Sequence, residues 1–293
     1  MKKLAFAAAA TVLLTAPAMA QRNFDTVEIT TEQIAPGIAV LFGAGGNIGV
    51  SHGADGTILI DDQFAPLTGK IQAAIADLGA APVEFLINTH WHFDHTGGNE
   101  NFGKEGALIF AHHNVRTRMA TGGAAAGNDT PPAPGVALPV VTYEQGVRFN
   151  LNGDEIDVIF TGGGHTDGDS VIMWRNANTV HMGDLYFNIP GYPFIDTNSG
   201  GNVVNAMNSL DMVIRMIDDK TKVIPGHGAM SNKAELVAYR AVMGEAVSRV
   251  RRLKGEGMSL EETVAATPLA DFNRGEGFIG PDQFVTAIWN SLD

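Results

Sequence analysis

Short apolar runs alternate with amphipathic stretches along the first half of the chain, and this pattern predicts strands and helices in succession. Apolar residues at helical spacing, ending at Gly79, predict a helix over 65–78. The runs that predict strands are bounded by glycine-containing turns in several places, and they cover 38–42, 47–52, 56–60, 83–88 and 107–111. A short helix is expected over 114–119.

The second half begins with strands and ends in helices. Residues 140–186 are mostly strand-like, with Gln-Gly and Asn-Gly turns, and KVIP at 222–225 predicts a further strand. Helices are expected over 202–217 and 232–253, and a Ser-x-x-Glu capping box predicts another from Ser259. Strands interspersed with helices favour sheets covered by helices in one α/β domain, which we assign to residues 21–293.

Residues 121–139 (TGGAAAGNDTPPAPGVALP) are rich in glycine, alanine and proline and predict a surface loop. The alternative is a linker between two domains. The β-patterned segments on either side look like parts of one sheet system, which favours the loop.

The first twenty residues differ from the rest. Lys2 and Lys3 precede an apolar run too short to span a bilayer, and Ala18-Met19-Ala20 forms a small-x-small cleavage pattern. We interpret residues 1–20 as a signal peptide; the alternative is an N-terminal membrane anchor. Export without any cysteine predicts a disulfide-free periplasmic protein.

Acidic residues outnumber basic ones, and the formal net charge is −13, or −15 without Lys2 and Lys3. A chain this acidic argues against nucleic acid or an anionic membrane as a partner, because both require a basic surface. A small-molecule substrate is expected instead. The sequence does not define an oligomeric state.

The densest cluster of metal-binding side chains is THWHFDHTGGN at 89–99, directly after the predicted strand 83–88. His90 and His92 are two residues apart, so in extended backbone both imidazoles face the same side. Asp94 and His95 follow at once. Four donors within six residues fit two adjacent metals better than one tetrahedral ion.

Three later residues share one context, which is a glycine-containing loop at the end of an apolar strand. They are His165 in TGGGHTDGDS, Asp184 in HMGDLYF and His227 in VIPGHG. Loops at the carboxyl ends of strands are where α/β proteins tend to place their chemistry. The recurrence predicts one shared site.

HWHFDH, GGGH, HMGD and PGHG together resemble the metal-ligand series of the metallo-β-lactamase-fold superfamily of dinuclear metallohydrolases. The resemblance runs from about Ile34 to Gly228 and implies a four-layer αββα sandwich with the site at one rim. Carried over residue by residue, it assigns His90, His92 and His165 to a first metal, Asp94, His95 and His227 to a second, and Asp184 to both.

Three neutral imidazoles would leave the first metal strongly Lewis acidic and lower the pKa of its bound water towards ~7. The expected activity is that of a dizinc hydrolase, in which a bridging hydroxide opens a carbonyl substrate. Asp94 is the expected catalytic residue, because it lies between the two ligand groups and would orient the hydroxide and pass a proton to the leaving group.

One departure concerns the substrate and the metal. Well-known β-lactamases of the superfamily carry cysteine at the position of Asp184 and lysine three residues later, where this chain has Phe187. The lysine binds a substrate carboxylate, so its absence weakens a β-lactamase interpretation and brings the chain nearer the thioesterase and lactonase branches. Aspartate also makes the site compatible with iron or manganese.

Four further residues are candidates for the second shell or for substrate contact: Asp61, Tyr186, Asn198 and Asn202. Asp61 matches a second-shell acid of the family and would orient a ligand histidine; a plain turn role is the alternative. Tyr186 would donate to a developing oxyanion or simply pack. Asn198 and Asn202 would reach substrate or form turns.

The leading substrate expectation is a β-lactam, because hydrolysis of β-lactams is useful in the periplasm. The alternatives are a lactone or thioester hydrolase, an iron-dependent oxygenase acting on sulfur compounds, and a non-catalytic periplasmic metal-binding protein. The last would need a site closed to solvent, which glycine-rich rim loops disfavour.

Overall fold

A computed structural model of the chain describes residues 23–292. The predicted signal peptide at 1–20 lies outside this range. Among the described residues, no helix combines the length and the apolar character needed to cross a bilayer.

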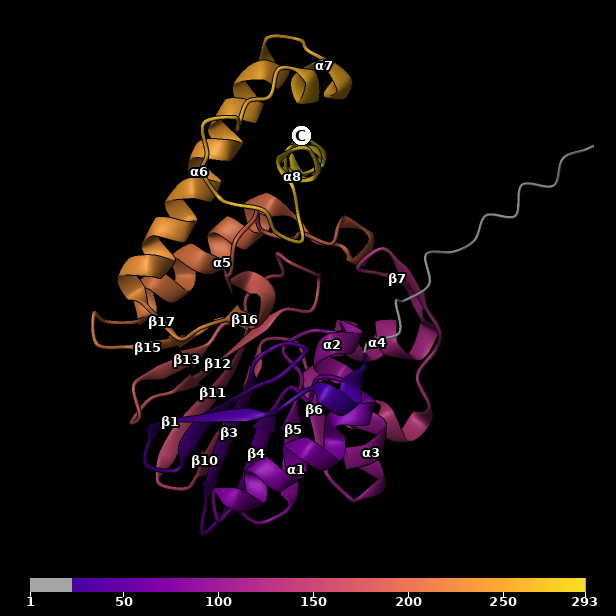
Figure 1. Cartoon of the computed structure of the whole chain (residues 1–293), viewed down its shortest axis with the longest axis vertical. Coiled ribbons are helices and arrows are strands. Elements are labelled where there is room, and N and C mark those ends of the chain that lie inside the picture. Colours follow the sequence, from indigo (N-terminus) through magenta and orange to yellow (C-terminus); the bar gives the residue numbers. More distant parts are fainter. Residues whose placement is uncertain (1–22, 293) are drawn as a thin grey trace, which may run out of the picture.

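Two large sheets form the centre of the molecule (Figure 1). The first sheet has the order β1-β2-β3-β4-β5-β6-β9. Its strands are β1 (Thr30–Ala35), β2 (Ile38–Phe42), β3 (Ile48–Gly53), β4 (Gly56–Ile60), β5 (Val83–Ile87), β6 (Leu108–His112) and β9 (Val141–Tyr143). The second sheet has the order β10-β11-β12-β13-β15-β17. Its strands are β10 (Gly146–Leu151), β11 (Asp154–Phe160), β12 (Ser170–Trp174), β13 (Thr179–His181), β15 (Lys222–Ile224) and β17 (Ser231–Asn232).

Helices cover the outer face of each sheet (Figure 1). The first half of the chain contributes α1 (Thr68–Asp77), α2 (Phe93–Thr96), α3 (Asn99–Lys104) and α4 (His113–Thr121). The second half contributes α5 (Val203–Met216), α6 (Lys233–Gly255), α7 (Leu260–Ala265) and α8 (Pro281–Ser291). The long helix α6 extends beyond the second sheet, and α7 lies next to its far end (Figure 1).

Side chains alternate between the two faces of each strand, so the apolar core is divided into layers. In β4, Ile58 and Ile60 pack between the two sheets, whereas Leu59 packs against α1. In β12, Ile172 and Trp174 face the inter-sheet core, and their neighbours face α5, α6 and α8. Helix, sheet, sheet and helix therefore follow one another, and the expected α/β sandwich is confirmed.

Most predicted elements lie within one or two residues of their expected positions, and the capping box at Ser259 is formed. The segment 121–139, expected to be a surface loop, lies largely at the surface, but it is not irregular throughout. This segment contains the hairpin β7 (Gly123–Ala125) and β8 (Asn128–Thr130) and a 3₁₀ turn at Gly135–Ala137. Ala125 is fully buried, because it belongs to a small apolar cluster with Trp91 and Val115 beside the site described below. Strand β1 and helix α8 were not predicted.

The strands that precede the predicted site residues end at the same edge of the sandwich. Strands β4 and β5 are parallel, as are β13 and β15, and β11 runs in the direction of β13 because β12 is antiparallel to both. The loops after these strands therefore meet. A further short parallel pair, β14 (Phe187–Asn188) and β16 (His227–Gly228), joins two of these loops directly.

Candidate metal centre

The motif after β5 changes from extended to helical backbone in its middle. His92 is extended, and the one-turn helix α2 then carries Asp94 and His95. The rings of His90 and His92 are 4.8 Å apart at their centroids, as expected for residues on one side of an extended segment. The helical turn directs Asp94 and His95 towards a separate group of ligand atoms.

The structure brings together the seven residues expected to bind metal, in two groups. His90, His92, His165 and Asp184 form the first, and Asp94, His95 and His227 form the second. The ligand atoms of each group lie within 4.8 Å of one another. Each group contains residues more than 70 positions apart in the sequence. They lie close together because the strands that precede them end at the same edge of the sandwich.

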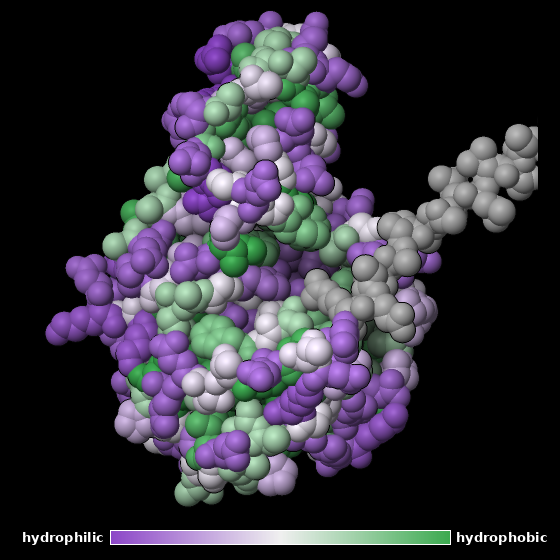
Figure 2. Space-filling model, in the orientation of Figure 1, coloured by the Kyte–Doolittle hydropathy of each residue, from purple (hydrophilic) through white to green (hydrophobic). Residues whose placement is uncertain are grey.

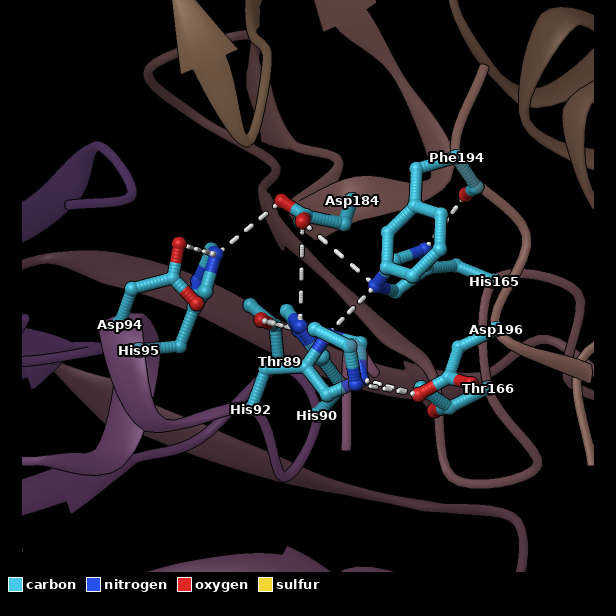
Figure 3. Close-up of polar contacts among 12 residues, drawn as sticks. Thr89, His90, His92, Asp94, His95, His165, Thr166, Asp184, Phe194 and Asp196 are labelled. Atoms are coloured by element: carbon cyan, nitrogen blue, oxygen red, sulfur yellow. Dashed lines mark hydrogen bonds and ion pairs between the residues drawn. The ribbon is translucent and has the colours of Figure 1, made fainter. Parts of the chain in front are cut away.

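Asp184 lies between the two groups, and its two oxygens face different ones (Figure 3). Its Oδ1 lies 3.1 Å from His95 Nε2 and 3.5 Å from His227 Nε2. Its Oδ2 lies 3.5 Å from His165 Nε2 and 3.9 Å from His90 Nε2. A carboxylate in this position can contact two ions at once.

The donor set fits metal ions. It consists of imidazole nitrogens and carboxylate oxygens, a combination suited to zinc, and the chain has no cysteine to add. The Nε2 atom of His90 is buried and has no hydrogen-bond partner. A buried polar atom without a partner is costly, so this nitrogen is the atom a bound ion would satisfy.

The ring nitrogens that do not face the centre are held by outer partners (Figure 3). Asp61 Oδ2 lies 2.8 Å from His95 Nδ1, and Thr89 Oγ1 lies 3.0 Å from His90 Nδ1. Asp196 Oδ2 lies 2.8 Å from His92 Nε2. The backbone oxygen of Phe194 lies 2.7 Å from His165 Nδ1. Acceptors at these positions place the ring protons outside and leave the inner nitrogens free to bind metal.

Burial and charge set the protonation of the centre. Burial lowers the pKa of His165 to about 4 and also lowers the pKa of His90, so both imidazoles are neutral at pH 7. Burial opposes charge on Asp184, but His95 and His227 outweigh it and hold the pKa of that carboxyl well below its usual range. Burial opposes charge on His227 as well, but Asp184 and Asp94 outweigh burial and raise the pKa of His227 to about 9.

The ligand side chains differ in exposure. The side chains of Asp94 and His227 are 24% and 23% exposed, whereas His90, His92, His95 and His165 are at most 2% exposed. The centre therefore opens to solvent on the side of Asp94 and His227. This exposure does not match a closed storage site.

Several residues that build the site were not identified from the sequence. Thr89 directly precedes His90, so its place next to the motif was a usable signal. Asp196 is 104 positions from His92, and no local pattern marks it. Asn47 also belongs here, because its side chain donates to the backbone oxygens of Pro225 and Gly228 on either side of His227.

The four secondary candidates have different outcomes. Asp61 contacts a ligand histidine, and its φ of +61° is unusual for a residue other than glycine. Tyr186 lies in the core with its hydroxyl 2.9 Å from Ser231 Oγ, and Asn202 caps α5 by accepting from Val204 and Asn205. The structure thus gives Tyr186 a packing role and Asn202 a capping role. Asn198 is exposed beside Asp196.

The sequence model of the Metallo-beta-lactamase superfamily matches residues 42–227, more than half of the chain. The chain is 26% identical over 151 residues to 2,4-dinitroanisole O-demethylase subunit alpha of Nocardioides sp. (strain JS1661), covering 49% of this chain and 42% of that one. It is 23% identical over 184 residues to metallo-beta-lactamase type 2 of Bacteroides fragilis, covering 60% and 69%. It is 29% identical over 163 residues to hydroxyacylglutathione hydrolase of Rhodospirillum rubrum, covering 55% and 54%.

Among solved structures, the sec-alkylsulfatase Pisa1 from Pseudomonas sp. superposes with a TM-score of 0.67 at 16% identity, covering 89% of this chain and 50% of that one. At this identity the likeness concerns the fold alone. The matches span about half the length of the demethylase subunit, the hydroxyacylglutathione hydrolase and the alkylsulfatase.

Proposed function

Because the chain belongs to the metallo-beta-lactamase superfamily and gathers two ligand groups around Asp184, we propose that it is a dinuclear zinc hydrolase of carbonyl compounds. The observation that carries the proposal is the position of Asp184, whose two oxygens face different groups. His90, His92 and His165 would hold one ion, Asp94, His95 and His227 the other, and Asp184 both.

Bound zinc would supply Lewis acidity and lower the pKa of a coordinated water towards ~7. The chain's own contribution is orientation and proton transfer. The outer partners fix four ligand imidazoles, so little reorganisation is needed when substrate binds. Asp94 stands at the open side with Oδ2 3.4 Å from His227 Nε2, where it can orient the nucleophilic water, accept its proton and hand that proton to the leaving group.

Lactones, thioesters and β-lactams all present the carbonyl group that this chemistry requires. Likeness to the Bacteroides enzyme supports a β-lactam, the leading expectation from the sequence, and likeness to hydroxyacylglutathione hydrolase supports a thioester. Phe187 lies parallel to the ring of His227, with centroids 5.7 Å apart, so this position offers no cation for a substrate carboxylate. We therefore place thioesters and lactones ahead of β-lactams.

We also propose that the protein is exported to the periplasm and acts there on a small molecule rather than on nucleic acid. The basic and apolar start of the chain and the net charge of −13 support this proposal. Expression of the full chain in a Gram-negative host, followed by fractionation and N-terminal sequencing, should find a periplasmic protein beginning at Gln21. A cytoplasmic protein with an intact N-terminus would contradict it.

The test of the activity is a hydrolysis screen of lactones, thioesters and β-lactams with zinc-loaded protein, with metal content measured in parallel. We expect about two zinc ions per chain and turnover in at least one class. Asp94→Asn should remove most of that turnover. One tightly bound iron with oxygen uptake on a sulfur compound would favour the oxygenase, and bound zinc without any turnover would favour a binding protein.

A further inference from the structure

Three phenylalanines line one side of the metal centre, and we call Phe187, Phe194 and Phe278 the aromatic wall. Phe187 lies parallel to His227, with an interplanar angle of 6°, and its ring centroid is 5.7 Å from that of His165. His227 is on the open side of the centre. The wall therefore begins where a substrate would enter.

Phe194 continues the wall over the first ligand group (Figure 3). Its ring centroid lies 6.0 Å from that of His92 at 23°, and 5.4 Å from that of His165 in an edge arrangement. Phe278 follows, with its ring centroid 5.4 Å from that of Phe194 at 86°. These contacts connect buried ligands to the surface through aromatic rings alone.

Phe278 is 68% exposed, the highest value among the exposed large apolar side chains of residues 23–292. A single exposed apolar residue is ordinary, but an exposed residue continuous with a hollowed site is typical of a binding surface. Figure 2 shows apolar surface at the border of a hollow between the helical part and the sandwich.

The segment that carries Phe278, residues 273–280, is fastened across the loop 190–192. Gly191 donates to the oxygen of Arg274 at 2.8 Å, and Tyr192 donates to the oxygen of Ile279 at 3.1 Å. At Gly277 a Cβ atom would collide with the oxygen of Pro190, so only glycine allows this close approach. The position of Phe278 is thus fixed by backbone contacts on both sides.

This segment lies outside residues 42–227, the part that the superfamily model matches. We propose that the aromatic wall is the subsite for an apolar acyl group of the substrate, and that Phe278 determines specificity for the length of that group. The inference rests on the proposed hydrolase function. It narrows the substrate class to esters, thioesters or lactones with a medium-length apolar acyl chain.

The first test compares 4-nitrophenyl acetate with 4-nitrophenyl hexanoate on zinc-loaded protein. Against a wall open on one side, each methylene should contribute about twofold, so kcat/KM should rise about 16-fold across the four methylenes that separate acetate from hexanoate. Phe278→Ala should reduce this ratio about threefold. Gly277→Ala, which displaces the segment rather than the ring, should reduce it similarly. Val140→Ala, an exposed apolar residue before β9, should leave the ratio unchanged.

The second test needs no turnover: saturation-transfer NMR with hexanamide and acetamide on the same proteins. The wall predicts transfer to the hexanamide chain that weakens in Phe278→Ala. Equal ester rates and no hexanamide transfer would overturn the inference and leave the hydrolase proposal standing. Hexanamide transfer without hydrolysis of any ester, lactone, thioester or β-lactam would overturn the hydrolase and support the wall. Absence of both hydrolysis and hexanamide transfer would overturn the hydrolase proposal and the inference about the wall.

Discussion

The carboxylate of Asp61 accepts a hydrogen bond from Nδ1 of His95 at 2.8 Å, and the same oxygen accepts from Thr89 Oγ1 at 2.7 Å. Thr89 in turn contacts His90. Asp61 therefore holds one ligand of each metal group, directly for the second and through Thr89 for the first. Its backbone, with φ of +61°, is kept in a conformation that costs energy, which is common where a side chain must be aimed.

Asp61→Asn should weaken the binding of both zinc ions by about 10–100-fold, because outer partners of ligands typically have effects of this size. Competition with a chelator of known affinity measures both steps. Asp196→Asn is the matched comparison, since the side chain of Asp196 bonds only His92 among the ligands. Asp196→Asn should weaken the binding of the first ion, which His92 would hold, more than the binding of the second. An Asp61→Asn protein with unchanged affinity at both sites would rule out this role.

Asp184→Ala should reduce the metal content from about two ions to about one and remove most activity, because it deletes the carboxylate between the groups. Elemental analysis after dialysis measures the content. Asp184→Cys should keep two zinc ions, since thiolate is a good zinc ligand. Asp219→Ala, an exposed aspartate, is the control and should change neither quantity. Loss of both ions in Asp184→Cys would contradict the assignment.

Metal binding should release protons. Asp184 and Asp94 raise the pKa of His227 to about 9 despite its burial, and Asp184, Asp94 and Asp61 outweigh burial to raise the pKa of His95 as well. Zinc must displace these protons, so affinity should rise with pH by about tenfold per unit for each proton released between pH 7 and 9. Calorimetry in two buffers of different ionisation enthalpy should count one to two protons. A pH-independent affinity would contradict this.

Asn47→Ala should lower both stability and affinity for the second ion. The Asn47 side chain donates to Pro225 O at 2.9 Å and to Gly228 O at 2.8 Å, so its loss leaves two largely buried carbonyl groups without that partner. The cost should be about 1–3 kcal/mol. At roughly 2–4 °C of Tm per kcal/mol, thermal unfolding would detect it. Asn205→Ala, an exposed residue on α5, should leave Tm unchanged.

Local signals allowed much of the site to be predicted. Each metal-binding residue lies in the segment that follows an apolar strand, and the end of a parallel strand marks one edge of a sheet wherever that strand is placed. The motif around His90 also restricts its own geometry, because residues two apart share a side in extended backbone.

Contacts between distant segments were not predictable in the same way. The hairpin at 123–130 has a loop-like composition, yet Ala126 donates its backbone N–H to Asp196, which holds His92. Tyr186 stands two residues from Asp184 but points into the core towards Tyr239. Proximity along the chain did not indicate its partner, because Asp184 lies in the 3₁₀ turn Gly183–Leu185, and the rule that residues two apart share a side holds only in extended backbone.

The sequence by itself determined the donor types, the pairing of His90 with His92, and the order of strands and helices, since these follow from local spacing and from the period of each element. Only the tertiary structure decided that Asp196 holds His92, that Asp61 reaches ligands of both groups through Thr89, and that Phe278 contacts Phe194 from beyond the matched region. These relationships join residues up to about a hundred positions apart, and they exist because the packing of two sheets and the helices that cover them brings distant segments together at one edge.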